Sequence, residues 1–253
     1  MWNPEIQSCD SVTLNSFHKL SKGEIPAIII RDFYSNSECQ DILQQMKNEK
    51  IIGNHLVGPF LMSHTTDKTN YFLKSEEILP VFERIFFHVE NPHSKVAGLF
   101  SAIFPKHLVS IASEDGKQYS PYIFRIHKKG KSIPLHKDNV KYEGIEYAVS
   151  KISKQFSCVV HLQESEIGGN LIISNKQWEK SDEKFREIDF GYSQKLVENY
   201  HNCILDDLHK GDLVIINPNF FHQVTEIQGK SDRITIGMFV GIDDNLNRIV
   251  CWA

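Results

Sequence analysis

Ser132-Ile-Pro-Leu-His136-Lys-Asp138-Asn139 is the stretch around which the rest of the chain is organised. It places an imidazole and a carboxylate two residues apart, directly after a short apolar run. Side chains at positions i and i+2 of an extended chain point to the same side, so His136 and Asp138 are able to hold one metal ion together. The pair alone is a weak signal, because 12 histidines in 253 residues produce such pairs by chance.

Two downstream motifs supply the parts that a metal site would still lack. His222 lies in Asn217-Pro-Asn-Phe-Phe-His222-Gln-Val, and Arg233 opens the later apolar run Arg233-Ile-Thr235-Ile-Gly-Met-Phe. Two histidines and one carboxylate on one face of a metal form the ligand set of non-haem Fe(II) oxygenases. Thr235 follows Arg233 by two positions and therefore shares its face of an extended strand.

In this order the motifs resemble the iron(II)- and 2-oxoglutarate-dependent dioxygenases, in particular their prolyl-hydroxylase-like branch. The resemblance covers residues 119–241 and includes Gly168-Gly169 and Lys210-Gly211-Asp212, which lie between the two ligand motifs. It implies that His136, Asp138 and His222 bind Fe(II) and leave positions for 2-oxoglutarate and O2. It also implies a mainly β fold with flanking α-helices, built on a double-stranded β-helix, or jelly-roll, core.

The resemblance also implies a site for the far carboxylate of 2-oxoglutarate. Arg233 offers a planar, permanently charged fork that suits bidentate binding of a carboxylate, and Thr235 adds a hydroxyl donor. Arg125, in the alternating run Tyr122-Ile-Phe-Arg125-Ile-His127, is able to contact either 2-oxoglutarate or substrate, and we assign it to the co-substrate. His161, in the middle of an apolar strand, is a rival metal ligand, but we expect a hydrogen-bonded core histidine.

Asp138 bears on the choice of reaction. Halogenases of this fold have Gly or Ala at this position, so the carboxylate implies hydroxylation coupled to decarboxylation of 2-oxoglutarate. The segment Gly168-Gly169-Asn-Leu-Ile-Ile-Ser-Asn-Lys-Gln-Trp178 and the run Cys251-Trp252-Ala253 look most like free-standing amino-acid hydroxylases and halogenases. That likeness implies a free amino acid or a derivative as the small-molecule substrate, and a basic amino acid such as lysine falls within this class.

Three other functions compete with this interpretation. A protein hydroxylase of the prolyl-hydroxylase type commonly has Lys where this chain has Arg233. A nucleic-acid demethylase of the superfamily carries a second Arg where this chain has Phe239. A non-catalytic, cupin-like binding protein would use the same barrel without any chemistry, and the turnover of 2-oxoglutarate separates that case from the enzymes.

Composition argues against several broad classes of protein. The chain is 41% hydrophobic and 24% charged, and its net charge of −4 gives no electrostatic footprint for nucleic acid. The five cysteines are odd in number and scattered, which argues against a disulfide framework or a zinc ribbon. No basic, apolar leader and no run of about 18 apolar residues is present, so we expect a cytoplasmic protein with no membrane partner.

We predict a single domain over residues 1–253, with an α/β scaffold in 1–118 and the jelly roll in 119–241. In the scaffold we expect a strand over 25–33, a helix capped by Ser37, an irregular segment over 53–71, and helices over 76–89 and 94–111. The jelly-roll strands are marked by period-two runs at 122–127, 133–136, 156–162, 170–174, 212–217, 222–227 and 233–240. Residues 176–206 form a long insert, either a cover for substrate or a solvated excursion.

Overall fold

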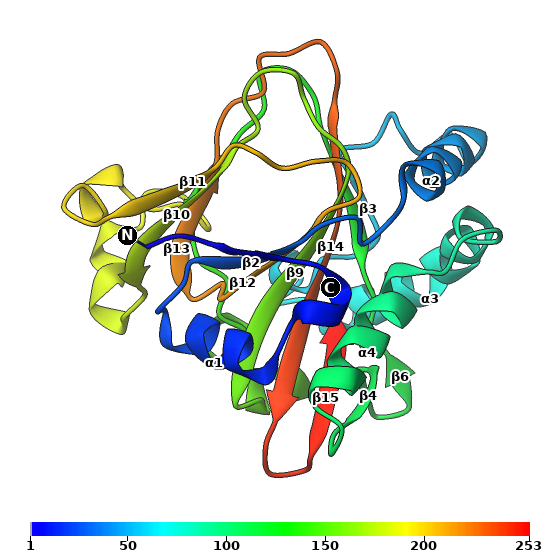
Figure 1. Cartoon of the computed structure of the whole chain (residues 1–253). Coiled ribbons are helices and arrows are strands. Elements are labelled where there is room, and N and C mark those ends of the chain that lie inside the picture. Colours follow the sequence, from blue (N-terminus) through cyan, green and yellow to red (C-terminus); the bar gives the residue numbers. More distant parts are fainter. Residues whose placement is uncertain (1) are drawn as a thin grey trace.

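The computed structural model describes residues 2–253, and most of its strands form two sheets that face each other (Figure 1). The larger sheet has the order β1 (Glu5–Gln7), β2 (Ala27–Ile30), β12 (Leu213–Ile216), β9 (Lys154–Gln163), β14 (Arg233–Asp243), β15 (Arg248–Trp252) and β4 (Leu108–Ile111), with β7 (Ile123–His127) and β3 (Leu56–Val57) branching from β14. The smaller sheet has the order β11 (Asn202–Leu205), β10 (Leu171–Gln177), β13 (Phe220–Val224) and β8 (Ile133–His136). The mainly β, jelly-roll fold predicted from the sequence is thereby confirmed.

Strand β14 organises the larger sheet because it changes partner along one edge. Residues 233–237 pair with β7, and residues 239–243 pair with β15, whereas β9 runs along the other edge for almost the whole length. The half of β14 that begins with Arg233 therefore lies inside the jelly roll. The other half extends the sheet toward the hairpin with β15.

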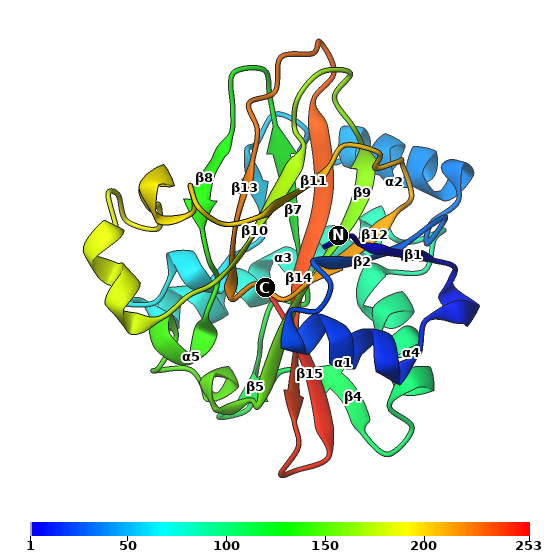
Figure 2. The same ribbon diagram turned by 60° about the vertical axis from the view of Figure 1, so that its left-hand side comes forward.

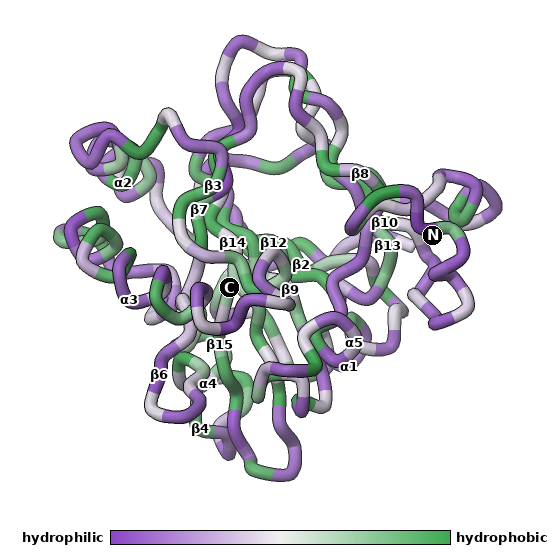
Figure 3. The backbone as a smooth tube through the Cα atoms, turned by 180° about the vertical axis from the view of Figure 1, so that it is seen from behind, coloured by the Kyte–Doolittle hydropathy of each residue, from purple (hydrophilic) through white to green (hydrophobic). Residues whose placement is uncertain are grey.

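Helices cover the outer face of the larger sheet (Figure 2). These are α1 (Leu14–Lys22), α2 (Asn36–Asn48), α3 (Lys68–Ile85) and α4 (Pro92–Ile103). Phe17 of α1 meets Phe100 of α4 and Phe156 of β9 in edge-on contacts, with ring centroids 5.0 and 5.3 Å apart. Coloured by hydropathy, the central strands are apolar, and polar residues gather in the connecting loops (Figure 3).

The apolar run of β2 has no polar face because both of its faces are buried. Ile28 and Ile30 pack among the helices, whereas Ala27 and Ile29 point between the two sheets, against Leu171 and Val224 among others. Such a strand appears in the sequence as a continuous hydrophobic run, as the strand expected over 25–33 does.

Three scaffold details differ from expectation. The cap of α2 is Ser35 rather than Ser37: its Oγ accepts a bond from the Glu38 amide at 3.2 Å, and the Glu38 carboxylate accepts one from the Ser35 amide at 2.6 Å. Helix α3 begins at Lys68, well before position 76, and takes in the end of the segment expected to be irregular. A helix over 94–111 is wrong beyond Ile103, because Leu108–Ile111 forms β4, which pairs in parallel with β15.

The insert expected over residues 176–206 is irregular only in its middle. Its last residues form β11, an edge strand of the smaller sheet, and between them and β10 lie two 3-10 turns, Lys180–Phe185 and Gln194–Leu196. Short helix α5 (Val140–Glu143) follows β8, and the two-residue strands β5 (Ser113–Glu114) and β6 (Lys117–Gln118) form a separate hairpin.

All five cysteines are free thiols: Cys9 is exposed, and the other four are buried. Among residues 2–253, no helix combines the length and the hydropathy that a membrane span requires.

Gly168 provides a test of how tightly the loop after β9 is packed. Its φ is +75°, and a Cβ at this position would overlap the backbone carbonyl oxygen of Glu226. Gly116 has the same φ with open space around it. We expect Gly116→Ala to lower the free energy of unfolding by about 1 kcal/mol, the cost of the left-handed conformation alone. Gly168→Ala should cost roughly 3 kcal/mol, because the backbone must also move.

Urea unfolding of both variants measures this difference directly. Equal losses of stability in Gly168→Ala and Gly116→Ala would show that the loop yields without cost and that the overlap with Glu226 is not a constraint.

Candidate metal centre and its cavity

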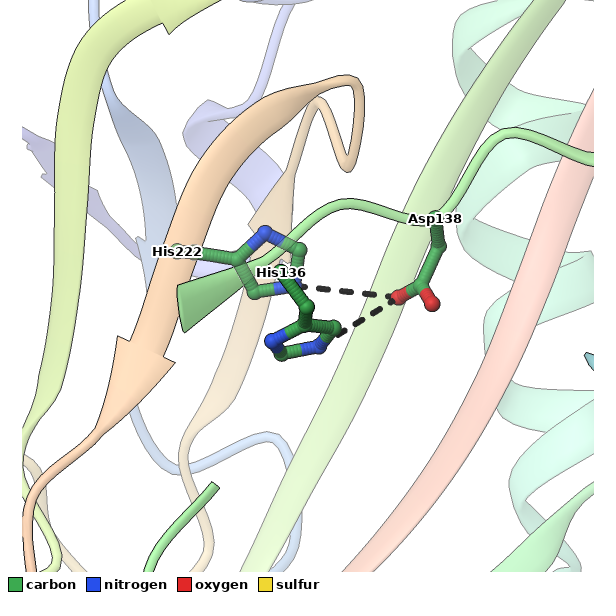
Figure 4. Close-up of side chains that lie close together, drawn as sticks. All are labelled: His136, Asp138 and His222. Atoms are coloured by element: carbon green, nitrogen blue, oxygen red, sulfur yellow. Dashed lines mark ion pairs between the residues drawn. The ribbon is translucent and has the colours of Figure 1, made fainter. Parts of the chain in front are cut away.

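The three predicted metal ligands come together at one end of the smaller sheet (Figure 4). His136 is the last residue of β8, and His222 lies directly opposite it on β13 in antiparallel register. Asp138 follows in the loop after β8, where its amide donates to the carbonyl of Pro218 at 2.9 Å. One ligand atom from each side chain lies within 4.8 Å of the other two.

Both imidazoles turn the same nitrogen toward the carboxylate. Nε2 of His136 and Nε2 of His222 lie 3.9 and 3.7 Å from Oδ2 of Asp138. Each Nδ1 faces a backbone carbonyl two residues earlier, that of Pro134 at 2.9 Å and that of Phe220 at 2.8 Å. A carbonyl only accepts, so Nδ1 carries the proton and the Nε2 lone pair is free to coordinate.

The electrostatics of the three side chains suit a divalent cation. Burial and the neighbouring His222 lower the pKa of His136 to about 4, which keeps this imidazole neutral. Burial alone would raise the pKa of Asp138, but the nearby histidines and Arg125 outweigh it and hold the value at about 2. Two neutral imidazoles and one carboxylate on one face fit Fe(II) and leave its remaining positions open.

The three residues line a cavity of about 500 Å³ between the two sheets. Strands β7, β9 and β14 form one wall, and β8 and β13 form the other. The segment before α3 contributes Phe60 and Met62, and the middle of the insert contributes Arg186, Asp189 and Phe190. Three residues of the insert therefore lie in the cavity wall, where a cover for substrate would be expected.

One end of the cavity collects buried polar atoms that have no hydrogen-bond partner among residues 2–253. They are Nε of Arg233, Oγ1 of Thr235, Nε2 of His161 and Nδ1 of His127. Register explains the grouping, since Arg233 lies opposite His127 and Thr235 lies opposite His161 on the neighbouring strands. Unpaired buried polar groups are costly, so this end of the cavity fits a ligand rich in oxygen acceptors, as a dicarboxylate is.

Glu164 lies behind His161 and Arg233 at this end of the cavity and partly balances the positive charge there. Its Oε1 lies 2.6 Å from Nδ1 of His161, and its Oε2 lies 3.6 Å from Nε of Arg233. Burial would raise the pKa of Glu164, but His161 and Arg233 lower it below its usual range. Burial and the two arginine charges, Arg233 and Arg125, lower the pKa of His127 to about 3, so His127 is a neutral hydrogen-bonding group.

Arg125 reaches the same cavity from β7, next to Thr235 in register. Its guanidinium lies against Gly237 of β14, and its Cζ stands 5.0 Å from the centroid of the Phe60 ring. Burial lowers the pKa of Arg125, an effect that the charge of Asp138 opposes. The structure thus brings all six predicted site residues to one cavity (His136, Asp138, His222, Arg233, Thr235 and Arg125).

A further group behind the metal site was not expected from the sequence. Lys137, between two candidate ligands, is buried against the Trp178 ring, with Nζ 4.5 Å from its centroid, and lies 2.7 Å from Oε1 of Glu143. The same oxygen lies 3.2 Å from Arg186 of the insert. These contacts fasten the insert to the loop that carries Asp138. Alternation places Lys137 on the opposite face from the ligands, but no sequence pattern identifies its partners.

Comparison with known proteins gives one family and several similar folds. The family described as "Carrier-protein-independent halogenase WelO5" matches residues 8–253. No sequence of a curated protein matches significantly.

Among solved structures, an N-substituted L-amino acid dioxygenase from Burkholderia ambifaria AMMD, in complex with alpha-KG, is similar with a TM-score of 0.65. It is 13% identical, and the match covers 94% of this chain and 90% of that one. The non-heme alpha ketoglutarate dependent epimerase SnoN from nogalamycin biosynthesis is similar with a TM-score of 0.51 at 8% identity, covering 90% and 84% of the two chains. At sequence identities this low, the two matches show that this chain has a similar fold.

Proposed function

The chain belongs to the family of carrier-protein-independent halogenases typified by WelO5, and on that premise we propose that this member hydroxylates its substrate instead of halogenating it. It is an enzyme of the Fe(II)- and 2-oxoglutarate-dependent dioxygenase superfamily. The observation that carries the proposal is Asp138. Its carboxylate lies within 4 Å of both candidate ligand histidines, at the position where halogenases of this fold have Gly or Ala.

In this proposal His136, Asp138 and His222 hold the iron. The backbone carbonyls behind the two imidazoles fix their tautomers, and the anchored loop of Asp138 presents the third ligand. When bound, Fe(II) supplies activation of O2, coupled to oxidative decarboxylation of 2-oxoglutarate. The balanced reaction converts a substrate C–H bond, O2 and 2-oxoglutarate into the alcohol, succinate and CO2.

Arg233 and Thr235 bind the far carboxylate of 2-oxoglutarate. A charged fork and a hydroxyl on one face of β14 match the two oxygens of a carboxylate, and both groups are buried without another hydrogen-bond partner in residues 2–253. The neutral imidazole of His127 adds a further hydrogen-bonding group opposite Arg233. These residues orient the co-substrate and exclude water from its far end.

The substrate is a small molecule of the amino-acid class. Apart from the Arg233 end, the cavity lining includes charges of both signs (Arg125, Lys137, Arg186, Glu143 and Asp189) and apolar side chains (Phe60, Met62 and Phe190). A zwitterion with an aliphatic portion is complementary to such a surface. A basic amino acid such as lysine belongs to this class, and the dioxygenase from Burkholderia is described as acting on N-substituted L-amino acids.

Halogenation is the second candidate, because the family description names it. It requires a metal position open to halide, and the carboxylate of Asp138 takes that position in our assignment. In this assignment, the side chain at position 138 decides between hydroxylation and halogenation, and it can be changed by mutation.

Asp138→Gly is expected to abolish hydroxylation without creating an efficient halogenase. The change removes one ligand and one negative charge, which opens a position beside the metal for chloride. Efficient transfer also needs the substrate placed within about 1 Å of the correct geometry, and errors of that size cost roughly a hundredfold in rate.

The measurement is mass spectrometry of products from purified enzyme, Fe(II), 2-oxoglutarate, chloride and the twenty proteinogenic L-amino acids. We expect wild type to give an oxygenated product from at least one of them. The variant should give none at a comparable rate. Hydroxylation by Asp138→Gly at the wild-type rate would remove Asp138 from the ligand set, and chlorination by wild type would refute the hydroxylase assignment.

A further inference from the structure

Arg125 is a half-buried cation in the cavity wall, and its partner is not a protein side chain. Among residues 2–253, no carboxylate lies within ion-pair distance of its guanidinium, and the nearest charge that favours its ionised form is that of Asp138. Withdrawing a cation from water is costly unless an anion pairs with it. By contrast, Arg233 and Arg186 in the same cavity each have a glutamate close by, Glu164 and Glu143 respectively.

The guanidinium of Arg125 packs between Gly237 of the larger sheet and the ring of Phe60, and we call this position its seat. Gly237 of β14 has no side chain, and a Cβ there would overlap Nη1 of Arg125 and lie 3.0 Å from its Cζ. The ring of Phe60 lies beside the guanidinium, with 5.0 Å between the ring centroid and Cζ. A planar cation held between a glycine and an aromatic ring is fixed in position, which favours recognition of a carboxylate.

The position of this seat separates Arg125 from the far carboxylate of 2-oxoglutarate. Gly237 lies four residues beyond Arg233 on β14, and this separation is roughly 13 Å along a strand. The charge of Arg125 lies near Asp138, whereas Arg233 lies beside Glu164, so the two arginines serve different parts of the cavity.

We propose that Arg125 binds the carboxylate of the substrate and so sets which carbon faces the metal. This rests on the proposed function, because it specifies how the amino-acid substrate is held. It also departs from the assignment of Arg125 to 2-oxoglutarate that the sequence favoured. The other cations near the insert, Lys137 and Arg186, are already occupied by Glu143, so Arg125 is the free anchor for an anion.

The test compares Arg125→Met with wild type for two ligands separately. Anaerobic titration of the Fe(II) protein with 2-oxoglutarate gives its Kd from the visible charge-transfer band, independently of turnover. The substrate probe is each proteinogenic L-amino acid that stimulates succinate formation, paired with its carboxamide, which lacks the negative charge.

We expect the carboxamide to be a poorer substrate than the acid for wild type, by about tenfold to a hundredfold in kcat/KM. In Arg125→Met the acid should fall to the level of its carboxamide, whereas the Kd of 2-oxoglutarate stays within about twofold. Arg84→Met is the matched control, since Arg84 pairs with Glu49 on the surface and should leave both ligands unaffected.

Gly237→Ala keeps the charge of Arg125 but displaces the guanidinium from its seat, so it should reproduce the loss of preference for the acid. A raised Kd for 2-oxoglutarate in Arg125→Met would place Arg125 in the co-substrate site and overturn the proposal. An undiminished preference for the acid in both variants would overturn it equally. If no amino acid stimulates succinate formation by wild type, this assignment falls together with the amino-acid substrate. Loss of the charge-transfer band in wild type would instead contradict the proposed iron and 2-oxoglutarate site.

Discussion

His222→Ala is expected to release the iron and to stop turnover of 2-oxoglutarate. His222 is 5% exposed, and its ring is already oriented by the carbonyl of Phe220, so its Nε2, which faces Asp138 at 3.7 Å, would bind a metal without reorganisation. Removing a group that only hydrogen-bonds to a metal ligand lowers the metal affinity by about 10- to 100-fold. Deleting the ligand itself should cost more than that.

Iron stoichiometry after desalting and the rate of succinate formation measure the two effects independently. His88→Ala is a suitable control, because His88 is exposed and far in sequence from every cavity residue. A His222→Ala protein that keeps one equivalent of iron would show that the cluster of His136, Asp138 and His222 is not the metal site.

Arg233→Met should raise the Kd of 2-oxoglutarate by about a hundredfold or more, since leaving one member of a buried charge pair alone costs on the order of 3–5 kcal/mol. Arg233 is 3% exposed, so water cannot replace its side chain easily. Iron binding should persist, because Arg233 is not in the ligand cluster. The anaerobic charge-transfer band gives the Kd directly.

Arg248→Met is the matched control for this change. Arg248 lies on β15 at the far end of the same hairpin and pairs with Asp243 at 3.2 Å. Both variants lose one arginine near β14, but we expect Arg248→Met to keep wild-type affinity for 2-oxoglutarate. Equal Kd values for wild type and Arg233→Met would exclude Arg233 from the co-substrate site.

Local pattern was enough to predict much of the jelly roll. Short runs of β-branched and aromatic residues between turn signals located β7, β8, β9, β10, β12, β13 and β14, even though β12 and β14 are buried on both faces. The pair His136 and Asp138 could also be recognised from local sequence, because residues at i and i+2 of an extended chain point to the same side. Linking them to His222 required the family resemblance, since local sequence does not reveal strand register.

Features that depend on distant partners were missed. Strand β4 was expected to be helix, and it is a strand because β15, more than a hundred residues later, pairs with it. Strand β11 was hidden in the insert for the same reason, with β10 as its partner. The contact of Lys137 with Trp178 and the seat of Arg125 on Gly237 likewise join segments that only the folded chain brings together.

The position of β2 in the larger sheet has a consequence for biosynthesis. Its partner β12 lies about 180 residues later, since Ile30 pairs with Leu213. At roughly 5–20 residues per second, the ribosome makes that partner roughly 10–40 s after β2 emerges. Throughout this interval the run Ala27–Ile30, apolar on both faces, is without its partner and is a natural binding site for a chaperone. Yield of the native enzyme should therefore depend on translation speed and chaperone supply as well as on final stability.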